Sequence, residues 1–403
     1  MRALSPFAAL CSVGFFARLS YALARSPVLP LFALSLGAGP EAIGFAVGIS
    51  TVTGIFFKLP AGALSDIIGR RTTMLIGLLF FAFTPFAYLG VHSYGPLVLV
   101  RFLHGMATAV YGPVAMAVVA DVAGAKKGEM LSWFSSVTII GNLLGAPLGG
   151  LILHRAAGAA EPALRDFHFA YLLSGITGVI ALLLFLGLLK DGRDRTESGG
   201  LGEATRRFFA GIREVASDRR VVITSLMEGM ANMAVGALEA FLPIYAVKVA
   251  GLNELQAGLL WAGQVVTTIL SKPLMGKTSD RYGRRALIAG GLVVAAISFA
   301  LIPNFRGFWP LLLAASCFGF GEALVTSSGA ALVADLCAER HFGTAMGTFG
   351  TIFDVGHASG PILAGVLIAR FSYGTAFLAL AGILVLAVPL FLATVREPSP
   401  LRN

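Results

Sequence analysis

The chain has 403 residues, of which 57% are hydrophobic and 13% are charged, and its formal net charge is +9. So few charged side chains cannot cover the surface of a protein of this length in water, which excludes a soluble globular protein. Its three cysteines are odd in number and scattered, so they predict neither a disulfide framework nor a metal site: Cys11, Cys317 and Cys337.

Apolar runs of about twenty residues recur along the whole sequence, and each is bounded by charged residues or by Gly and Pro. A helix of that length crosses the hydrocarbon core of a bilayer and satisfies its own backbone groups there. We therefore predict an all-α membrane protein with twelve transmembrane helices, at 7–35, 42–63, 73–92, 96–120, 131–153, 168–189, 221–248, 256–276, 287–303, 309–334, 345–369 and 374–394.

The first of these segments has the basic start, apolar centre and Ala-x-Ala ending of a secretory signal. Arg18 interrupts its apolar region, however, and apolar residues resume after Arg25. We therefore expect an uncleaved first helix.

One long polar stretch, 190–220, mixes both signs of charge and contains several glycines, which predicts a linker. Lysine and arginine gather in this stretch and in alternate loops between the predicted helices. By the positive-inside rule, this distribution places both termini in the cytoplasm. We interpret the net positive charge as a topology signal and expect no nucleic acid as a partner.

A charged sequence motif occurs twice, as "GALSDIIGRR" and as "GKTSDRYGRR", and the two copies are 214 positions apart. The offset relates Gly62, Asp66 and Arg70 to Gly276, Asp280 and Arg284. We predict two pseudo-symmetric six-helix halves, at 1–189 and 221–403, in parallel orientation about an axis along the membrane normal.

These features resemble the major facilitator superfamily, whose loop signature reads G-x-L-[AS]-D-[RK]-x-G-R-[RK]. The first copy has Ile67 where a basic residue is usual, and the second has Thr278 in place of the leucine. The resemblance covers nearly the whole chain and implies a membrane transporter that alternates access by rocking its two halves.

The resemblance also implies a gating latch that holds the cytoplasmic side shut in the outward-open state. In each copy the glycine would let helices approach closely, the aspartate would sit at a helix N-terminus, and the arginine would bond the same carboxylate. A plain positive-inside loop is the alternative. The predicted latch residues are Gly62, Asp66, Arg70, Gly276, Asp280 and Arg284.

Two glycine-rich segments resemble further family features. "GNLLGAPLGG" is similar to the antiporter signature, but Ala146 holds the proline position and Pro147 follows it. "GHASGPILAG" has the regular form with Gly360 and Pro361. We expect these residues at hinges and helix interfaces, with packing alone as the alternative: Gly145, Pro147, Gly360 and Pro361.

Ionisable side chains at membrane depth are expensive and mark substrate or ion pathways, although some serve packing alone. Arg18 and Arg25 are seven positions apart, so we expect them on one helix face. Asp354 and His357 are three apart and can touch. The candidates for proton coupling or substrate binding are Arg18, Arg25, Arg101, Glu228, Glu239, Glu322, Asp354 and His357.

Among the carboxylates we rank Glu239 first and Glu322 second as proton carriers. Glu228 lies nearer the predicted cytoplasmic end, where hydration would weaken its response, and Asp354 has His357 as a local partner. The spacing of Arg101 and Gly105 resembles an R-x-x-x-G pattern of the family. In drug/proton antiporters of the family, the arginine of this pattern is associated with proton coupling.

No phosphate-binding loop of the G-x-x-x-x-G-K-[ST] type occurs, so we expect an ion gradient as the energy source, no cofactor and no enzymatic activity. The resemblance to twelve-helix drug/proton antiporters implies proton-coupled efflux of small amphipathic compounds. We expect a monomer in the lipid bilayer of a bacterial-type inner membrane. The alternatives are a transporter of an organic anion or metabolite, anchored by Arg18, Arg25 and Arg101, and a membrane receptor that transports nothing.

Overall fold

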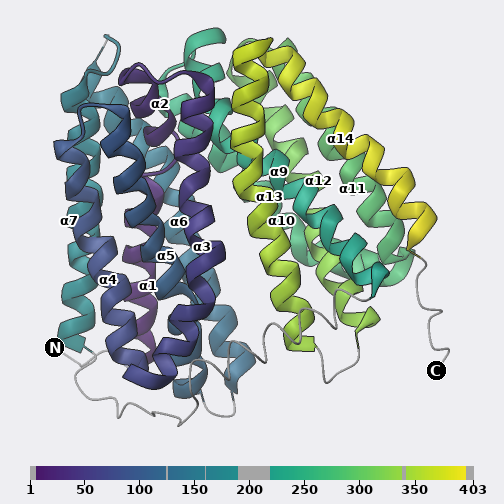
Figure 1. Ribbon diagram of the computed structural model, residues 1–403, viewed down its shortest axis with the longest axis horizontal. Coiled ribbons are helices and arrows are strands. Elements are labelled where there is room, and N and C mark those ends of the chain that lie inside the picture. The colour runs from purple at the N-terminus through teal and green to yellow at the C-terminus, as the bar shows by residue number, and fades with distance from the viewer. Residues whose placement is uncertain (1–5, 124–125, 159, 189–217, 338–341, 396–403) are drawn as a thin grey trace. The chain divides into compact units, whose positions relative to one another are not determined.

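A computed structural model describes residues 6–123, 126–158, 160–188, 218–337 and 342–395, without the side chains of Leu59, Asp66, Leu188 and 342–344. Every regular element in these ranges is a helix (Figure 1). Of the linker predicted at 190–220, residues 190–217 lie outside the described part of the chain.

The chain forms two compact units, each of which takes a short segment from the other half of the sequence. Unit 1 comprises Met1–Ala38, Ile49–Thr205 and Asn253–Leu259. Unit 2 comprises Gly39–Gly48, Arg206–Leu252 and Leu260–Asn403.

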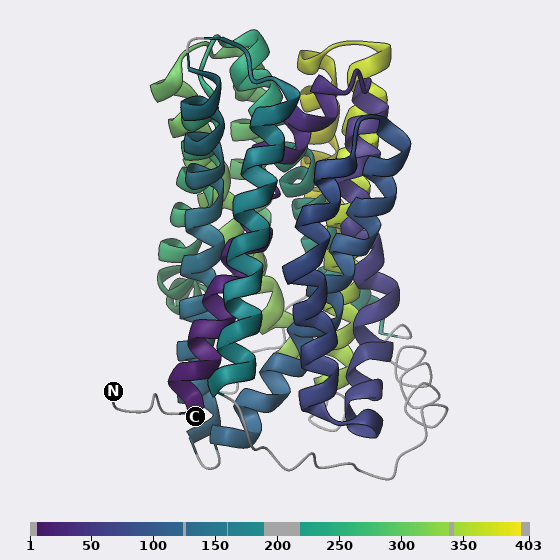
Figure 2. The same ribbon diagram turned by 90° about the vertical axis from the view of Figure 1, so that its left-hand side faces the viewer.

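In unit 1, α1 packs on α6 and α7, and α4 packs on α5 and α7 (Figures 1 and 2). Large apolar and aromatic side chains, among them Phe81, Tyr111 and Phe185, fill the space between these helices. The helices of this part of the chain are α1 (Pro6–Leu23), α2 (Val28–Ser35), α3 (Pro40–Ile68), α4 (Arg70–Ala87), α5 (Tyr94–Ala123), α6 (Lys127–Ala157) and α7 (Leu164–Leu188).

In unit 2, α13 packs on α9, while α11 packs on α12 and α14. The side chain of Asp218 caps α9 by accepting a hydrogen bond from the backbone N–H of Arg220. The helices are α9 (Arg219–Ile244, continued by a π-helical turn at Tyr245–Val249), α10 (Glu254–Tyr282), α11 (Arg284–Leu301), α12 (Phe308–Leu336), α13 (Phe342–Arg370) and α14 (Tyr373–Thr394).

Over the described residues, eleven helical segments are long and apolar enough to cross a membrane, counting α1 and α2 as one. The twelfth segment of this length is α10, which carries Lys272, Lys277 and Asp280 among its apolar residues. The predicted fold class is confirmed: this is an all-α, multi-pass membrane protein with twelve spanning segments.

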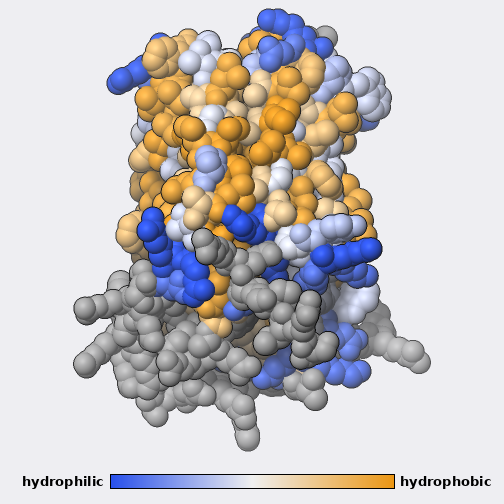
Figure 3. All heavy atoms as spheres, turned by 90° about the vertical axis from the view of Figure 1, so that its right-hand side faces the viewer, coloured by the Kyte–Doolittle hydropathy of each residue, from blue (hydrophilic) through white to orange (hydrophobic). Residues whose placement is uncertain are grey.

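Large apolar side chains on the outside of the helices mark the surface that lipid covers. Trp309 is 74% exposed and Leu386 is 73% exposed. Figure 3 shows hydrophobic atoms over most of the upper part of the face to the right of Figure 1, with hydrophilic atoms at its rim and in a band below. A surface this apolar is stable only against hydrocarbon.

The first span is broken, which differs from the single helix predicted at 7–35. α1 ends at Leu23 and α2 starts at Val28. Pro27 has no N–H to donate and restricts Ser26 before it, so the helix cannot continue through these residues. Arg25 therefore lies in the break, and the expectation that it shares a helix face with Arg18 is wrong.

The two copies of the charged loop have the same backbone. Gly69 has φ 95° and Gly283 has φ 93°, a region that side-chain-bearing residues rarely occupy. Each glycine directly precedes a helix, α4 or α11. Both loops therefore need glycine at this position, which is a physical reason for the repeated Gly-Arg-Arg.

Candidate functional site

The centre of unit 1 holds a fully buried arginine on α5. Arg101 is 0% exposed, and its Nη2 donates a hydrogen bond to Ser50 Oγ on α3 at 2.8 Å. One turn further along α5, a Cβ at Gly105 would lie only 2.7 Å from the carbonyl oxygen of Ser50. Glycine at this position lets α5 approach α3 closely enough for the hydrogen bond to form.

Tyr21 brings Arg101 and Arg25 together. The Arg101 guanidinium carbon lies 5.4 Å from the centre of the Tyr21 ring, and that of Arg25 lies 5.7 Å from it. These are cation–π distances, and such contacts are stronger when water is excluded. Two of the three predicted arginines therefore share one aromatic partner, which the sequence did not reveal.

Aromatic side chains enclose this cluster. The Tyr88 hydroxyl lies 3.3 Å from His104 Nδ1, and the Tyr88 ring stacks on Tyr171 with centroids 4.0 Å apart. The rings of Tyr21 and His104 pack edge to face. The result is a basic and aromatic site.

Unit 2 places a glutamate and a histidine in contact between two helices. His357 Nε2 on α13 lies 3.1 Å from Glu239 Oε2 on α9, and Glu239 is almost fully buried. Asp354 is also buried, but the hydrogen bond of His357 Nε2 reaches Glu239, a partner that spacing along one helix did not predict. One proton can be held between these two side chains.

Glu322 on α12 receives its contacts from α10. Gln264 Nε2 donates to Glu322 Oε2 at 2.5 Å, and Thr268 Oγ1 lies 2.9 Å from the same oxygen. Both partners are neutral, so these two contacts solvate the carboxylate with dipoles and bring no positive charge to it.

Glu228 is fully buried, which corrects the expectation that hydration reaches it. Asn232 and Thr326 each donate a hydrogen bond of 3.0 Å to its Oε1. Its Oε2 has no hydrogen-bond partner among the described residues, and the charges of Lys272 and Glu322 lie near enough to act on it. Glu228 therefore belongs with Glu239 and Glu322 as a candidate proton carrier.

The latch arginines contact aspartates that sequence reasoning missed. Arg70 pairs with Asp121 near the end of α5, and Arg284 Nε lies 2.9 Å from Asp335 near the end of α12. Arg284 also lies 3.4 Å from the predicted partner Asp280. The signal was available, because Asp121 and Asp335 are separated by the same offset of 214 positions.

The latch glycines do not make the expected close approach in this structure. Apart from the glycine's own stretch of helix, no described atom lies within 4 Å of a Cβ built at Gly62 or Gly276. The side chain of Asp66 lies outside the described residues. The role of these three residues stays a prediction.

The predicted hinge residues lie at helix contacts within each unit. A Cβ at Gly145 on α6 would clash with Ala22, and one at Gly360 on α13 would clash with the backbone of Met233 on α9. Pro147 and Pro361 are inside α6 and α13. These positions allow close packing, while their hinge role stays a prediction.

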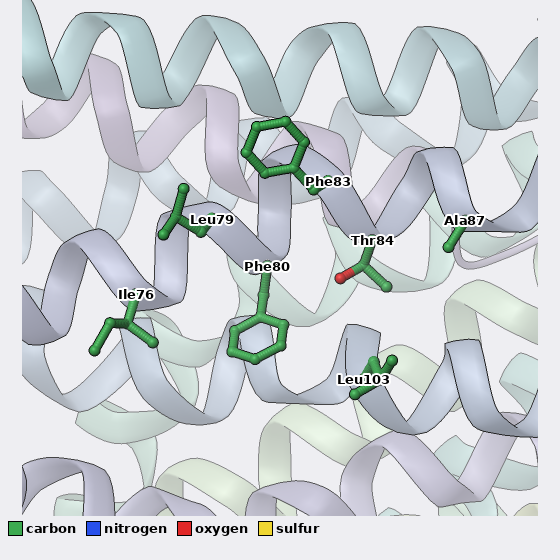
Figure 4. A pocket seen from close by; sticks show the side chains of 7 residues that line it. All are labelled: Ile76, Leu79, Phe80, Phe83, Thr84, Ala87 and Leu103. Atoms are coloured by element: carbon green, nitrogen blue, oxygen red, sulfur yellow. The ribbon is translucent and has the colours of Figure 1, made fainter.

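A groove on the outside of unit 1 is apolar. Figure 4 shows it between α4 and α5, and its volume is about 430 Å³. Its side chains are those of Ile76, Leu79, Phe80, Phe83, Thr84, Ala87 and Leu103. Several of them are exposed on spanning helices, so acyl chains of the bilayer would fill this groove.

Within the described residues, no cluster of His, Cys, Asp or Glu could hold a metal ion.

Comparison with known families decides the class of the protein. The family model described as Major Facilitator Superfamily matches residues 10–267 and 251–403. The chain belongs to this superfamily. It is thus a membrane transporter, as its twelve spans and internal repeat indicated.

Similar proteins include the quinolone resistance protein NorA of Staphylococcus aureus (strain MSSA476), 22% identical over 344 residues, which cover 85% of this chain and 84% of NorA. An uncharacterized MFS-type transporter of Methanocaldococcus jannaschii is 24% identical over 371 residues, covering 90% of this chain and 89% of the relative.

Solved structures of the same fold include the nucleoside transporter NupG, with a TM-score of 0.81, 15% identity and coverage of 98% of this chain and 100% of NupG. A bacterial homolog of the human lysosomal transporter Spinster has a TM-score of 0.79, 14% identity and coverage of 98% of this chain and 100% of the homolog.

Proposed function

We propose that this transporter exports small amphipathic compounds in exchange for protons. The observation that carries the proposal is the Glu239–His357 contact of 3.1 Å between two spanning helices. With a neutral histidine and an ionised glutamate the pair has one negative charge, and one added proton makes it neutral. A pair whose net charge changes in this way can couple proton movement to a change of conformation.

Glu228 and Glu322 support the same proposal. Both lie in unit 2, and their hydrogen bonds come from neutral amide and hydroxyl groups. Unit 1, in contrast, has Arg18, Arg25 and Arg101 in its spanning segments, and arginines suit a substrate better than a proton. The relation to NorA supports export of drug-like compounds as the direction and the substrate class.

The proposed mechanism is alternating access between two halves, at 1–189 and 221–403, joined by the linker 190–220. The distribution of Lys and Arg supports cytoplasmic termini. The relatives in Staphylococcus aureus and Methanocaldococcus jannaschii support a bacterial-type inner (cytoplasmic) membrane. The contacts of Arg70 and Arg284 at the repeated loops support a gate at that end of the helices. The working unit is a monomer.

Glu239→Gln tests the coupling site in proteoliposomes. The amide mimics a permanently protonated side chain, so substrate exchange should continue while accumulation driven by a pH gradient is lost. The measurements are uptake of a labelled quinolone with an imposed pH gradient, and exchange of the same compound at equal pH.

Glu129→Gln is the matched control, because it changes an exposed carboxylate at the start of α6. It should retain both activities. If Glu239→Gln still concentrates the quinolone while Glu228→Gln or Glu322→Gln does not, the coupling site moves to that residue. If all three variants concentrate it, the proposal of a carboxylate carrier in unit 2 is wrong.

A further inference from the structure

Arg18 is an intramembrane cation without a counter-ion in the described part of the chain. It lies in α1 among apolar residues, and none of the described groups makes a hydrogen bond or an ion pair with it. Arginine inside a bilayer is costly, and it normally faces the protein interior or water and pairs there. Arg101, for comparison, donates to Ser50.

The surroundings of Arg18 supply further positive charge and hydroxyl groups. The groups that act on it electrostatically are Tyr111, Tyr21 and Arg25. In unit 1 and in α3, the carboxylates on spanning helices lie only near helix ends: Glu41, Asp66, Asp121, Glu129, Asp166 and Glu254. The middle of this unit therefore has an excess of positive charge, which favours an anion.

The neighbouring turn of α5 presents backbone without a side chain and offers a donor. A Cβ at Gly112 would lie 3.9 Å from Arg18 Nη2, so the guanidinium borders a stretch of backbone that has no side chain. Tyr111, beside it in the sequence, is 1% exposed, and its hydroxyl has no hydrogen-bond partner among the described residues. A buried hydroxyl left without a partner costs free energy that a bound acceptor would recover.

We infer that the transported compound carries an anionic group, in the simplest case a carboxylate, that binds Arg18 and Tyr111. The guanidinium offers two parallel N–H donors that match a carboxylate, and the tyrosine hydroxyl donates a third hydrogen bond. This inference rests on the proposed export function and narrows its substrates to acidic amphipathic compounds. The charge that Arg18 brings into the bilayer is then neutralised by the substrate.

The test is equilibrium binding to the purified full chain of two probes that differ only in the charged group, a quinolone with a free carboxylate and its carboxamide. The wild type should bind the acid about tenfold to a hundredfold more tightly than the amide. The Arg18→Gln variant should bind the amide with the same affinity as the wild type does, and it should bind the acid no more tightly than the amide. Arg18→Lys should retain part of the preference, and Tyr111→Phe should weaken acid binding severalfold.

The controls separate binding from folding. Arg165→Gln changes an exposed arginine of the same unit and should leave the preference for the acid intact. Without ligand, the melting temperature of Arg18→Gln should equal or exceed that of the wild type, because no described hydrogen bond or ion pair is lost. A lower melting temperature would indicate a structural role and overturn the inference.

Three binding results would overturn the inference: equal affinity of the wild type for acid and amide, an unchanged preference in Arg18→Gln, or binding of neither probe. Binding of chloride or phosphate at Arg18 without a preference for the acid would also overturn it, because the site would then serve inorganic ions. The proposed export function would survive if the amide were still exported in exchange for protons. It would fail separately if no compound of either kind were exported.

Discussion

At the scale of single residues, the two units use their buried polar groups differently. In unit 1, Arg101 and Arg25 share the ring of Tyr21. In unit 2, Glu239 contacts His357 and Glu322 contacts Gln264. Basic groups that keep their charge suit a substrate, whereas acidic groups with neutral or titratable partners suit a proton.

Arg101→Ala should abolish coupled transport, because it removes the buried cation that contacts both Ser50 and Tyr21. Loss of a charged hydrogen bond also costs about 1.5–3 kcal/mol of folding free energy. Arg101→Lys retains the charge but loses the planar guanidinium. This variant should fold normally but transport poorly. The measurements are melting temperature and proteoliposome uptake; normal uptake by the alanine variant would leave Arg101 a structural role at most.

The partners of these residues were beyond sequence reasoning for a physical reason. Which side chains meet between two helices depends on the rotation and depth of each helix, and spacing along one helix does not fix either. The spacing of Asp354 and His357 along α13 gave no sign that His357 contacts Glu239 on α9. The repeat was more informative, since Ser50 and Gln264, which each make one of the key hydrogen bonds, are 214 positions apart.

At the scale of helices, hydropathy predicted the twelve spans well, but it did not predict where the helices end. The predicted span 96–120 is the helix Tyr94–Ala123, and 42–63 is Pro40–Ile68. Apolar residues mark the part of a helix inside the hydrocarbon, whereas the backbone continues as a helix into the polar region. Hydropathy did not show the break after Leu23, because the segments before and after it are both apolar. Pro27 was the signal for the break.

Close packing of α13 on α9 should depend on glycine. Gly360→Ala would place a methyl group against the backbone of Met233, so it should destabilise the protein by about 1–3 kcal/mol. Gly350→Ala is the matched control on the same helix, because no described atom outside its own stretch of helix lies within 4 Å of the added Cβ. Thermal unfolding in detergent measures both, and equal melting temperatures would contradict the packing role.

At the scale of the whole molecule, the charged loop occurs once in each half of the sequence with the same local structure. Each copy has a glycine with positive φ before a helix, and the arginine of each copy contacts an aspartate near the end of a neighbouring helix. Such exposed or half-exposed ion pairs contribute only about 0–1 kcal/mol each to stability. Their small contribution to stability is consistent with the proposed gate at the repeated loops.

Asp66→Asn should leave folding and insertion intact and impair transport, because an amide cannot pair with an arginine or a helix dipole as a carboxylate does. The measurements are proteoliposome uptake and the accessibility of single cysteines placed on either side of the membrane. In the Asp66→Asn variant, cysteines on the side of the repeated loop should become more accessible than in the wild type. Uptake and accessibility equal to those of the wild type would remove the latch role.

The central claim is that substrate and protons move in exchange, and one measurement tests it most directly. Purified protein is reconstituted into liposomes that contain a pH-sensitive dye, and a gradient of a transported quinolone is imposed at equal pH on both sides. Because coupling is reciprocal, the quinolone gradient alone should drive protons in the opposite direction and change the internal pH. Movement of the quinolone with no change of internal pH, under conditions where an imposed pH gradient is stable, would contradict proton exchange.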